Sequence, residues 1–281
     1  MIKLYNTLMK YSAGIIYNKS KANAKKLAFE ISLWLKDNKC KVFLNDSVSI
    51  KPKKIDFVLS IGGDGTMLKV IRTFSPLSVP IKGINLGSLG FLTDTDRDEV
   101  YDFLKNLLSS SFKIEKRILL SVEFIHNSKK VKTIAANDCV IRSLTGGKLI
   151  SVDVNIDKNF IAEYKCDGMI IATPTGSTAY SLAASGPIVY PNIPVFIITP
   201  ISPHTLAQRP MILSDKSSVS FTAKNKYATG KIVVSIDGQE NYTLPNSSKV
   251  KFSLYKKPLK LIKNCSKSYF ETLKTKLHWS V

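Results

Sequence analysis

The chain has 281 residues, 44% of them hydrophobic, and a formal net charge of +20. This length suffices for about two domains of typical size, and the apolar content excludes a disordered chain. No apolar run approaches the ~20 residues that cross a bilayer, and the first ten residues lack the apolar segment of a signal peptide. We therefore expect a soluble, cytoplasmic protein without a membrane partner.

The positive charge is carried mainly by dispersed lysines. Only five of the 41 basic residues are arginine, whereas bidentate recognition of bases and phosphates favours arginine. Aromatic residues do not alternate with the lysines as stacking on nucleic acid would require. The composition thus favours a solvated surface that attracts polyanionic small molecules, and it argues against a nucleic-acid partner.

The four cysteines are far apart in the sequence, and the three histidines stand at no metal-ligand spacing beside them. We therefore expect buried thiols at Cys40, Cys139, Cys166 and Cys265.

The first third of the chain alternates strand-like and helix-like patterns, which is typical of a parallel sheet with crossover helices. Strands are predicted at 13–17, 41–44, 57–60 and 81–86. Helices are predicted from Ser20, as N-cap, to Asn38, from Met67 to Phe74, and over 96–108. We place the first domain at residues 1–112 as an α/β domain.

Beyond residue 112 the hydrophobic period shortens toward two, with turn residues between short β-rich runs. These runs are 119–125, 149–156, 195–199, 219–223, 232–236 and 250–254. Their spacing predicts an all-β sandwich over 113–264, interrupted by one helix at 178–184. A final helix within 265–281 is expected to return to the first domain.

The glycine-rich run Gly62-Gly63-Asp64-Gly65-Thr66 follows an apolar strand. Glycines there let backbone N–H groups converge on a phosphate near a helix start. A carboxylate in such a place either binds a cation or takes a proton from an attacking hydroxyl. The plainer interpretation is a glycine turn in which Asp64 caps the next helix.

A second motif, from Cys166 to Tyr180, is a strand with an Asp-Gly turn before it and a hydroxyl-rich turn after it. Thr175, Ser177 and Thr178 offer groups suited to phosphate or sugar oxygens, and Tyr180 can pack against a base. The alternative is that the hydroxyls are ordinary helix caps and that Tyr180 belongs to the core.

Together the motifs resemble the NAD kinases, which phosphorylate the adenosine 2′-hydroxyl of NAD to give NADP. The resemblance rests on five segments, which occur in the family's order: 62–66, 85–92, Asn137-Asp138, 167–180 and 202–204. It extends weakly to residues 276–279. It implies an N-terminal α/β domain of Rossmann-like or phosphofructokinase-like type, a C-terminal β-sandwich and an active site between them.

The resemblance also implies roles for individual residues. Asp64 would be the general base on the ribose hydroxyl, and Gly62, Gly63, Gly65 and Thr66 would lie near the ATP phosphates. The NAD-binding group would be Asp64, Gly65, Phe91, Asn137, Asp138, Lys165, Asp167, Thr175, Thr178, Ala179 and Tyr180. Asp138 stands where many members have glutamate. Lys165 stands where many have arginine, and a lysine cannot reproduce a bidentate contact.

A divalent cation, Mg²⁺ or Mn²⁺, is expected to travel on the ATP phosphates near Asp64, because the sequence contains no dedicated oxygen cage. The partners implied are NAD, NADP and ATP, within a homo-oligomer that is a dimer or a tetramer. ATP and polyphosphate both remain open as donor. The alternatives are a lipid kinase of the diacylglycerol or sphingosine type, and a non-catalytic protein that binds NAD or nucleic acid.

Overall fold

The computed structural model describes residues 11–45, 55–87, 90–109, 112–144, 149–225, 231–263 and 268–279. The chain divides into two compact units: Met1–Lys116 with Leu259–Val281, and Arg117–Pro258. The domain boundaries expected from the sequence, at 112 and 264, would assign the segments around residues 114 and 260 to the β-sandwich domain. In the structure both segments contribute strands to the sheet of the first unit.

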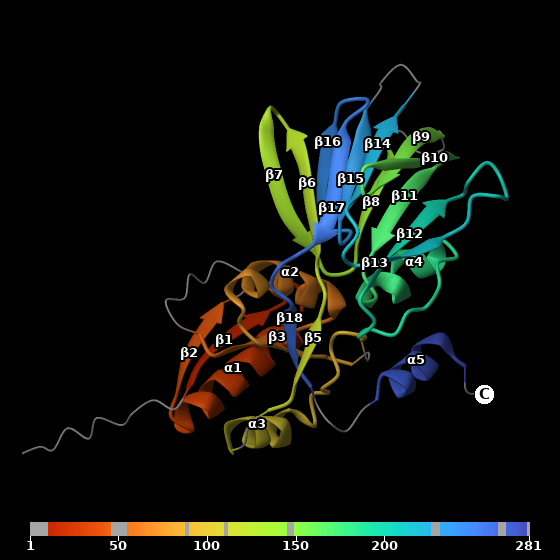
Figure 1. Cartoon of the computed structure of the whole chain (residues 1–281). Helices are drawn as coiled ribbons and strands as arrows, with labels where there is room; N and C mark the ends of the chain where they lie inside the picture. The colour runs from red at the N-terminus through yellow and green to blue at the C-terminus, as the bar shows by residue number, and fades with distance from the viewer. Residues whose placement is uncertain are drawn as a thin grey trace, which may run out of the picture. The chain divides into compact units, whose positions relative to one another are not determined.

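The first unit contains a six-stranded sheet of order β2-β1-β3-β4-β18-β5 (Figure 1). Its strands are β1 (Tyr11–Tyr17), β2 (Cys40–Asn45), β3 (Phe57–Ile61), β4 (Ile81–Ile84), β5 (Ile114–Arg117) and β18 (Leu259–Ile262). Neighbouring strands from β2 to β18 pair in parallel. The carboxyl ends of β3 and β4 therefore lie at the same edge of the sheet.

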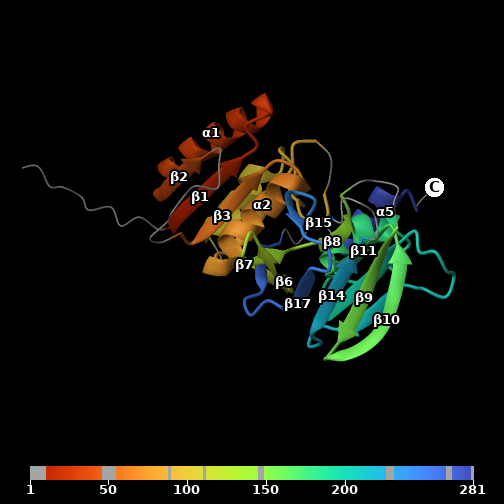
Figure 2. The ribbon, with the colours of Figure 1, turned by 90° about the horizontal axis from the view of Figure 1, so that it is seen from above.

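Helices cover both faces of this sheet: α1 (Ala22–Asp37), α2 (Asp64–Phe74) and α3 (Val100–Ser109). The unit also contains the 3-10 turn η1 (Ser75–Leu77) and the helix α5 (Tyr269–Leu277). Figure 2 shows α1 and α2 on opposite sides of β1 and β3. The apolar residues of α1 and α3 pack in one core cluster with the odd-numbered residues of β1 and β3, as the 3.6-residue spacing of their apolar positions predicts.

The second unit is a sandwich of two six-stranded sheets, ordered β10-β9-β14-β17-β6-β7 and β13-β12-β11-β8-β15-β16. Its strands are β6 (Leu120–His126), β7 (Lys129–Ala135), β8 (Asp138–Ser143), β9 (Ile150–Ile156), β10 (Asn159–Cys166), β11 (Gly168–Ala172), β12 (Val195–Ile201), β13 (Met211–Ser214), β14 (Val219–Lys224), β15 (Ile232–Ile236), β16 (Glu240–Leu244) and β17 (Lys249–Leu254). The strand pairs are antiparallel, and one apolar cluster fills the space between the sheets.

Three local predictions were wrong. Helix α1 begins at Ala22 with Lys21 as N-cap, so Ser20 does not cap it. Helix α2 begins at Asp64 and not at Met67. The helix expected at 178–184 is two short pieces, η2 (Thr175–Thr178) and α4 (Tyr180–Ala183), because Ala179 adopts φ −99° and ψ −131° and interrupts the helix. Within the described ranges every helix is too short or too polar to span a bilayer.

Candidate active site

The glycine loop joins the carboxyl end of β3 to the start of α2. Gly62 has φ +158°, and a Cβ on it would come within 2.5 Å of the hydroxyl oxygen of Thr66. Its N–H donates to the carbonyl oxygen of Ile84, which ties the loop to β4. Gly63 is the N-cap residue, and Asp64 is the first residue of the helix. The loop thus lies at the positive end of the α2 dipole, as a phosphate site requires.

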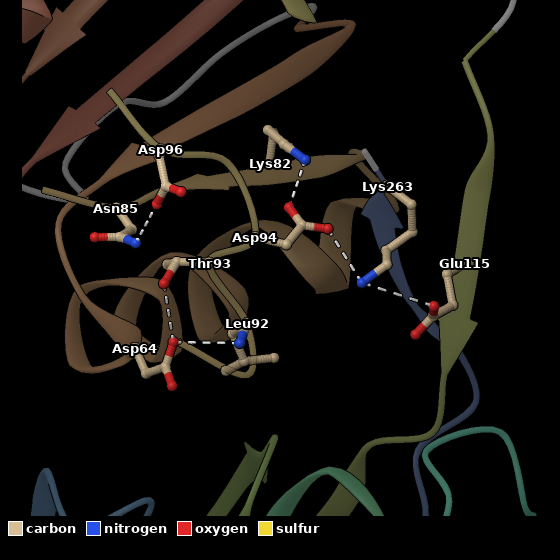
Figure 3. Close-up of polar contacts among 9 residues, drawn as sticks. All are labelled: Asp64, Lys82, Asn85, Leu92, Thr93, Asp94, Asp96, Glu115 and Lys263. Atoms are coloured by element: carbon tan, nitrogen blue, oxygen red, sulfur yellow. Dashed lines mark hydrogen bonds and ion pairs between the residues drawn. The ribbon is translucent and has the colours of Figure 1, made fainter. Parts of the chain in front are cut away.

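Asp64 turns its carboxylate toward the segment that follows β4 (Figure 3). Oδ2 accepts the N–H of Phe91 at 3.1 Å, while Oδ1 accepts the N–H of Leu92 at 3.2 Å and the hydroxyl of Thr93 at 3.3 Å. No side chain caps α2. The interpretation of Asp64 as a helix cap is therefore wrong. Its carboxylate is partly buried and oriented by three donors.

The approach between Asp64 and this segment is close. A Cβ on Gly90 would overlap Oδ1 of Asp64 and come too near the Thr93 hydroxyl, so only glycine fits there. Phe91 is partly buried, and its ring centroid lies 6.2 Å from that of Tyr269 on α5. Ser88 and Leu89, which belong to the same motif, lie outside the described residues.

Asn85 has a structural role at the end of β4. Its side-chain oxygen accepts the N–H of Gly87 at 2.6 Å, and its amide nitrogen donates to Asp96 at 2.8 Å. The asparagine of this motif thus holds the turn and the returning segment together (Figure 3).

In the second unit, three strand ends meet at one edge of a sheet. Asp138 at the start of β8 pairs with Ala172 at the end of β11, and Cys139 pairs with Ile236 at the end of β15. A pocket of ≈ 280 Å³ lies on this edge and on the sheet face away from the sandwich core. Its lining residues are Asn137, Asp138, Val140, Arg142, Ala179, Tyr180, Ser235, Asp237 and Gly238.

Asp237 is a site residue that the sequence analysis missed. Its carboxylate accepts three successive backbone N–H groups, from Ala136 at 3.2 Å, Asn137 at 2.8 Å and Asp138 at 3.3 Å. These bonds set the backbone from which Asn137 and Asp138 project. The available signal was an Asp-Gly pair directly after the apolar run 232–236, which indicates a tight hairpin turn. Both residues have positive φ, 50° for Asp237 and 65° for Gly238.

Asp138 titrates far from its ordinary range. Burial of the side chain and, second, the nearby charge of Asp237 raise the pKa of its carboxyl to about 7, against the opposing effect of a backbone hydrogen bond from Tyr180. Asp138 therefore changes charge near neutral pH within a pocket that also contains the half-exposed ring of Tyr180.

The hydroxyl-rich turn is folded tightly against Asn137. A Cβ on Gly176 would overlap the backbone of Asn137, and the hydroxyl of Thr173 donates to Ala136 at 2.5 Å. Ser177 is fully buried and bonds to the backbone of Pro174 and Val189. The prediction that Ser177 offers its hydroxyl to a ligand is therefore wrong.

Thr175 and Thr178, in the same turn, have different exposures. Thr175 is buried, and Thr178 is partly exposed with its hydroxyl donating to Thr175 at 3.4 Å. The structure does not bring Lys165 and Asp167 into the pocket. Both are exposed. Lys165 lies on β10 of the other sheet, and Asp167 directly precedes β11, at the end opposite the 173–180 turn.

Cys40, Cys139 and Cys166 are buried free thiols, and Cys265 lies outside the described residues. Across the described ranges no group of three or more histidine, cysteine, aspartate or glutamate side chains could hold a metal ion.

Fold and site together define a two-domain nucleotide-binding protein, with an α/β unit that carries a glycine loop and a β-sandwich that carries a polar pocket. Models of the ATP-NAD kinase N-terminal and C-terminal domains match residues 47–112 and 136–264. The NAD kinase of Syntrophotalea carbinolica is 37% identical over 281 residues, covering 95% of this chain and 98% of that protein.

Two solved structures share the fold. The NAD kinase from Archaeoglobus fulgidus in complex with ATP is 27% identical, with a TM-score of 0.79 over 96% of this chain and 100% of that one. Yeast NADH kinase complexed with NADH is 23% identical, with a TM-score of 0.84 over 96% of this chain and 88% of that one, and this likeness concerns the fold alone. The chain belongs to the NAD kinase family.

Proposed function

We propose that this protein transfers the γ-phosphoryl group of ATP to the adenosine 2′-hydroxyl of NAD, giving NADP and ADP. As a member of the NAD kinase family, the chain is a kinase that phosphorylates NAD. The single observation that carries the chemistry is the carboxylate of Asp64, oriented by three donors beside a glycine loop at a helix N-terminus.

Asp64 is the general base in this proposal. A carboxylate has about four acceptor positions. Among the described residues, Oδ1 of Asp64 uses two of them and Oδ2 uses one, which leaves a position on Oδ2 for the 2′-hydroxyl. The hydroxyl oxygen attacks the γ-phosphorus, the bond to the β,γ-bridging oxygen breaks, and the proton passes to Asp64 as ADP leaves.

The phosphates of ATP would bind at the glycine loop. Gly62, Gly63 and Gly65 leave room for a polyanion near the backbone, and Thr66 lies on the first turn of α2 with its hydroxyl facing Gly62. The helix dipole favours negative charge at this end. ATP and not polyphosphate is the donor we propose, because the similar Archaeoglobus protein is an ATP complex.

The dinucleotide would be held by the pocket of the second unit. Asn137 and Asp138 would bind ribose hydroxyls, and Tyr180 beside Ala179 would cover an aromatic ring. Thr175 and Thr178 would shape the turn beneath. We also propose contacts to NAD from Phe91, Lys165 and Asp167, which lie outside this pocket. Catalysis needs the 2′-hydroxyl within hydrogen-bond reach of Asp64.

The donor set fits a divalent cation of the Mg²⁺ or Mn²⁺ type. Mg²⁺ usually keeps several waters and binds through substrate phosphates, so the ion would be held mainly by the ATP phosphates close to Asp64, whose remaining acceptor position is left to the 2′-hydroxyl. When bound, the ion would neutralise charge on the phosphates. The chain's own contribution is to place Asp64 and the loop amides around that charge.

We further propose a homo-oligomer, a dimer or a tetramer, in the cytoplasm. The edge strand β10 exposes Phe160 and Ile161, and an apolar edge of this kind favours association with another copy. Free buried thiols at the three described cysteines fit a reducing compartment. Light scattering after size exclusion measures the assembly.

The deciding experiment is mass spectrometry of the product after incubation with NAD, ATP and Mg²⁺. The expected product is heavier than NAD by one phosphoryl group, which fragmentation places on the adenosine ribose. A parallel incubation with diacylglycerol vesicles tests the lipid-kinase alternative. ATP consumption with the vesicles and none with NAD would overturn the proposal, as would NAD that stays unmodified with all components present.

A further inference from the structure

Four charged side chains cluster behind the segment that holds Asp64 (Figure 3). Two of them lie on strands, Lys82 on β4 and Glu115 on β5, and two lie outside strands, Asp94 in the segment after β4 and Lys263 directly after β18. The ammonium of Lys82 lies 2.5 Å from Oδ1 of Asp94, and that of Lys263 lies 3.1 Å from Oδ2. Lys263 is also 4.0 Å from Glu115. Both oxygens of one carboxylate are thus bound by lysines.

The centre of this cluster is buried. Lys82 is 0% exposed and Asp94 is 6% exposed, and the Lys82 ammonium lies 4.3 Å from the centre of the Phe103 ring. Burial lowers the pKa of Lys82. For Asp94, burial works against ionisation, but the charges of Lys82 and Lys263 outweigh it and hold the pKa below its usual value. A buried ion pair is often no more stabilising than an apolar replacement. Stability alone therefore does not explain why two lysines bind the Asp94 carboxylate in this cluster.

Asp94 is covalently next to the donors that orient Asp64. The segment from Leu92 to Thr95 lies directly on β4: Thr95 pairs with Ile84, and a Cβ on Gly83 would come within 2.6 Å of the Leu92 carbonyl oxygen. The N–H of Leu92 and the hydroxyl of Thr93 bind Oδ1 of Asp64. Anchoring the side chain of residue 94 from two sides therefore fixes the direction in which these donors point.

We propose that Lys82, Asp94 and Lys263 are positioning residues for the catalytic base, and that they act by locking the 91–95 segment that orients Asp64. The inference rests on the proposed function, in which Asp64 accepts the substrate proton. In this proposal the three side chains act through Asp64 and not on substrate, as the burial of Lys82 and Asp94 requires for these two. Because Lys263 follows β18, the returning C-terminal strand completes the catalytic geometry of the first unit.

The first test replaces Lys263 by Met. Its side chain is 21% exposed, and the Lys82–Asp94 pair remains, so the variant is expected to fold. We expect kcat to fall roughly ten- to a hundredfold, since small misplacements of a catalytic group have effects of that size. The KM values for NAD and ATP should change less than about twofold because no binding group is altered. Lys263→Arg keeps the charge and should restore kcat.

The second variant is the neutral pair Lys82→Met with Asp94→Asn, which keeps the shape of the cluster and removes its buried charges. Both proteins are assayed at the same interval below their own melting temperatures. If the cluster serves stability alone, kcat of the variant should then equal the wild-type kcat, whereas the positioning role predicts a lower kcat. Lys105→Met serves as the control, because it removes an exposed ion pair with Asp102 on α3 of the same unit and should leave kcat unchanged.

Hydrogen exchange at the Phe91 and Leu92 amides provides a readout that needs no activity. Faster exchange in Lys263→Met, and wild-type exchange in Lys263→Arg and Lys105→Met, supports the inference. Wild-type kcat together with wild-type exchange in a folded Lys263→Met variant would overturn it. A wild-type protein that forms no NADP contradicts the proposed function, while the exchange measurement still decides the positioning role.

Discussion

Asp138 and Asp237 hold each other through reciprocal backbone and side-chain hydrogen bonds at neighbouring strand ends. The N–H of Asp237 donates to the carbonyl oxygen of Asp138 at 2.9 Å, and Oδ1 of Asp237 accepts the N–H of Asp138 at 3.3 Å. Two carboxyl groups are thereby kept close in a partly enclosed pocket. This pair accounts for both the shape and the pH response that we expect of the second unit.

Replacing Asp237 by Ala should weaken dinucleotide binding. Three backbone N–H groups lose their acceptor, and a lost partner costs about 1–3 kcal/mol at a buried group. We expect a lower free energy of unfolding by that order and a KM for NAD that rises more than the KM for ATP. Steady-state kinetics and urea unfolding measure both quantities.

Asp157→Ala is the matched control for Asp237→Ala. Asp157 makes the same reciprocal pair of bonds with Ser218, each 2.8 Å, at an exposed turn that does not line the pocket. It should lose stability without a change in the KM for NAD. Equal KM values for NAD in both variants would contradict the role of Asp237.

The raised pKa of Asp138 should make part of the stability depend on pH. Its pKa is about 7 in the folded protein against 3.8 for the free side chain. Between these values the folded state binds more protons, so the contribution is fully present below about pH 4 and is lost as pH rises through about 7. The stability difference between wild type and Asp138→Asn should fall over this window with a slope of at most ~1.4 kcal/mol per pH unit.

Urea unfolding at half-unit pH steps measures that difference. Above about pH 7 the difference should become constant, since both states are then ionised at this position. A difference that is flat from pH 4 to 7, or that rises, would show that the pKa of Asp138 is not raised.

Replacing Asp64 by Asn should remove the proton acceptor and keep the fold. Proton abstraction contributes about 10²–10⁴-fold, so kcat for NADP formation should fall by at least that factor. The amide oxygen can replace Oδ1 as acceptor for Leu92 and Thr93, whereas the Phe91 N–H would face the amide nitrogen and lose its acceptor. We therefore expect a folded variant whose melting temperature is slightly lower. Initial rates of NADP formation provide the measurement. Near-normal turnover in the variant would refute the assignment of the base.

Two glycines, one in each unit, should separate catalysis from dinucleotide binding. Gly90→Ala places a methyl group against the Asp64 carboxylate, and Gly176→Ala places one against the Asn137 backbone. We expect Gly90→Ala to lower kcat chiefly and Gly176→Ala to raise the KM for NAD chiefly. Each variant is the other's control for general strain. Identical changes in kcat and KM in the two variants would show that strain alone explains both.

The sequence by itself determined the local features and the class of fold. An apolar run that ends in Gly62-Gly63 predicts a strand followed by a phosphate-type loop, because glycine tolerance and hydrophobic period are local properties. The same reasoning predicts α1 from its apolar stripe and several sandwich strands from their alternation. Tyr180 was found from its motif, and Asn137, Asp138 and Ala179 from the resemblance to the NAD kinases, and the structure gathers the four around one pocket.

Only the tertiary structure decided which distant residues complete each site. Asp64 is oriented by an N–H 27 positions away, and Asn137 by a carboxylate 100 positions away. Strand β18 joins the first sheet beside β4 and brings Lys263 to Asp94. Such contacts depend on the register between strands and on ion pairs between residues that are far apart in the sequence. A local hydrophobic pattern does not encode either of them.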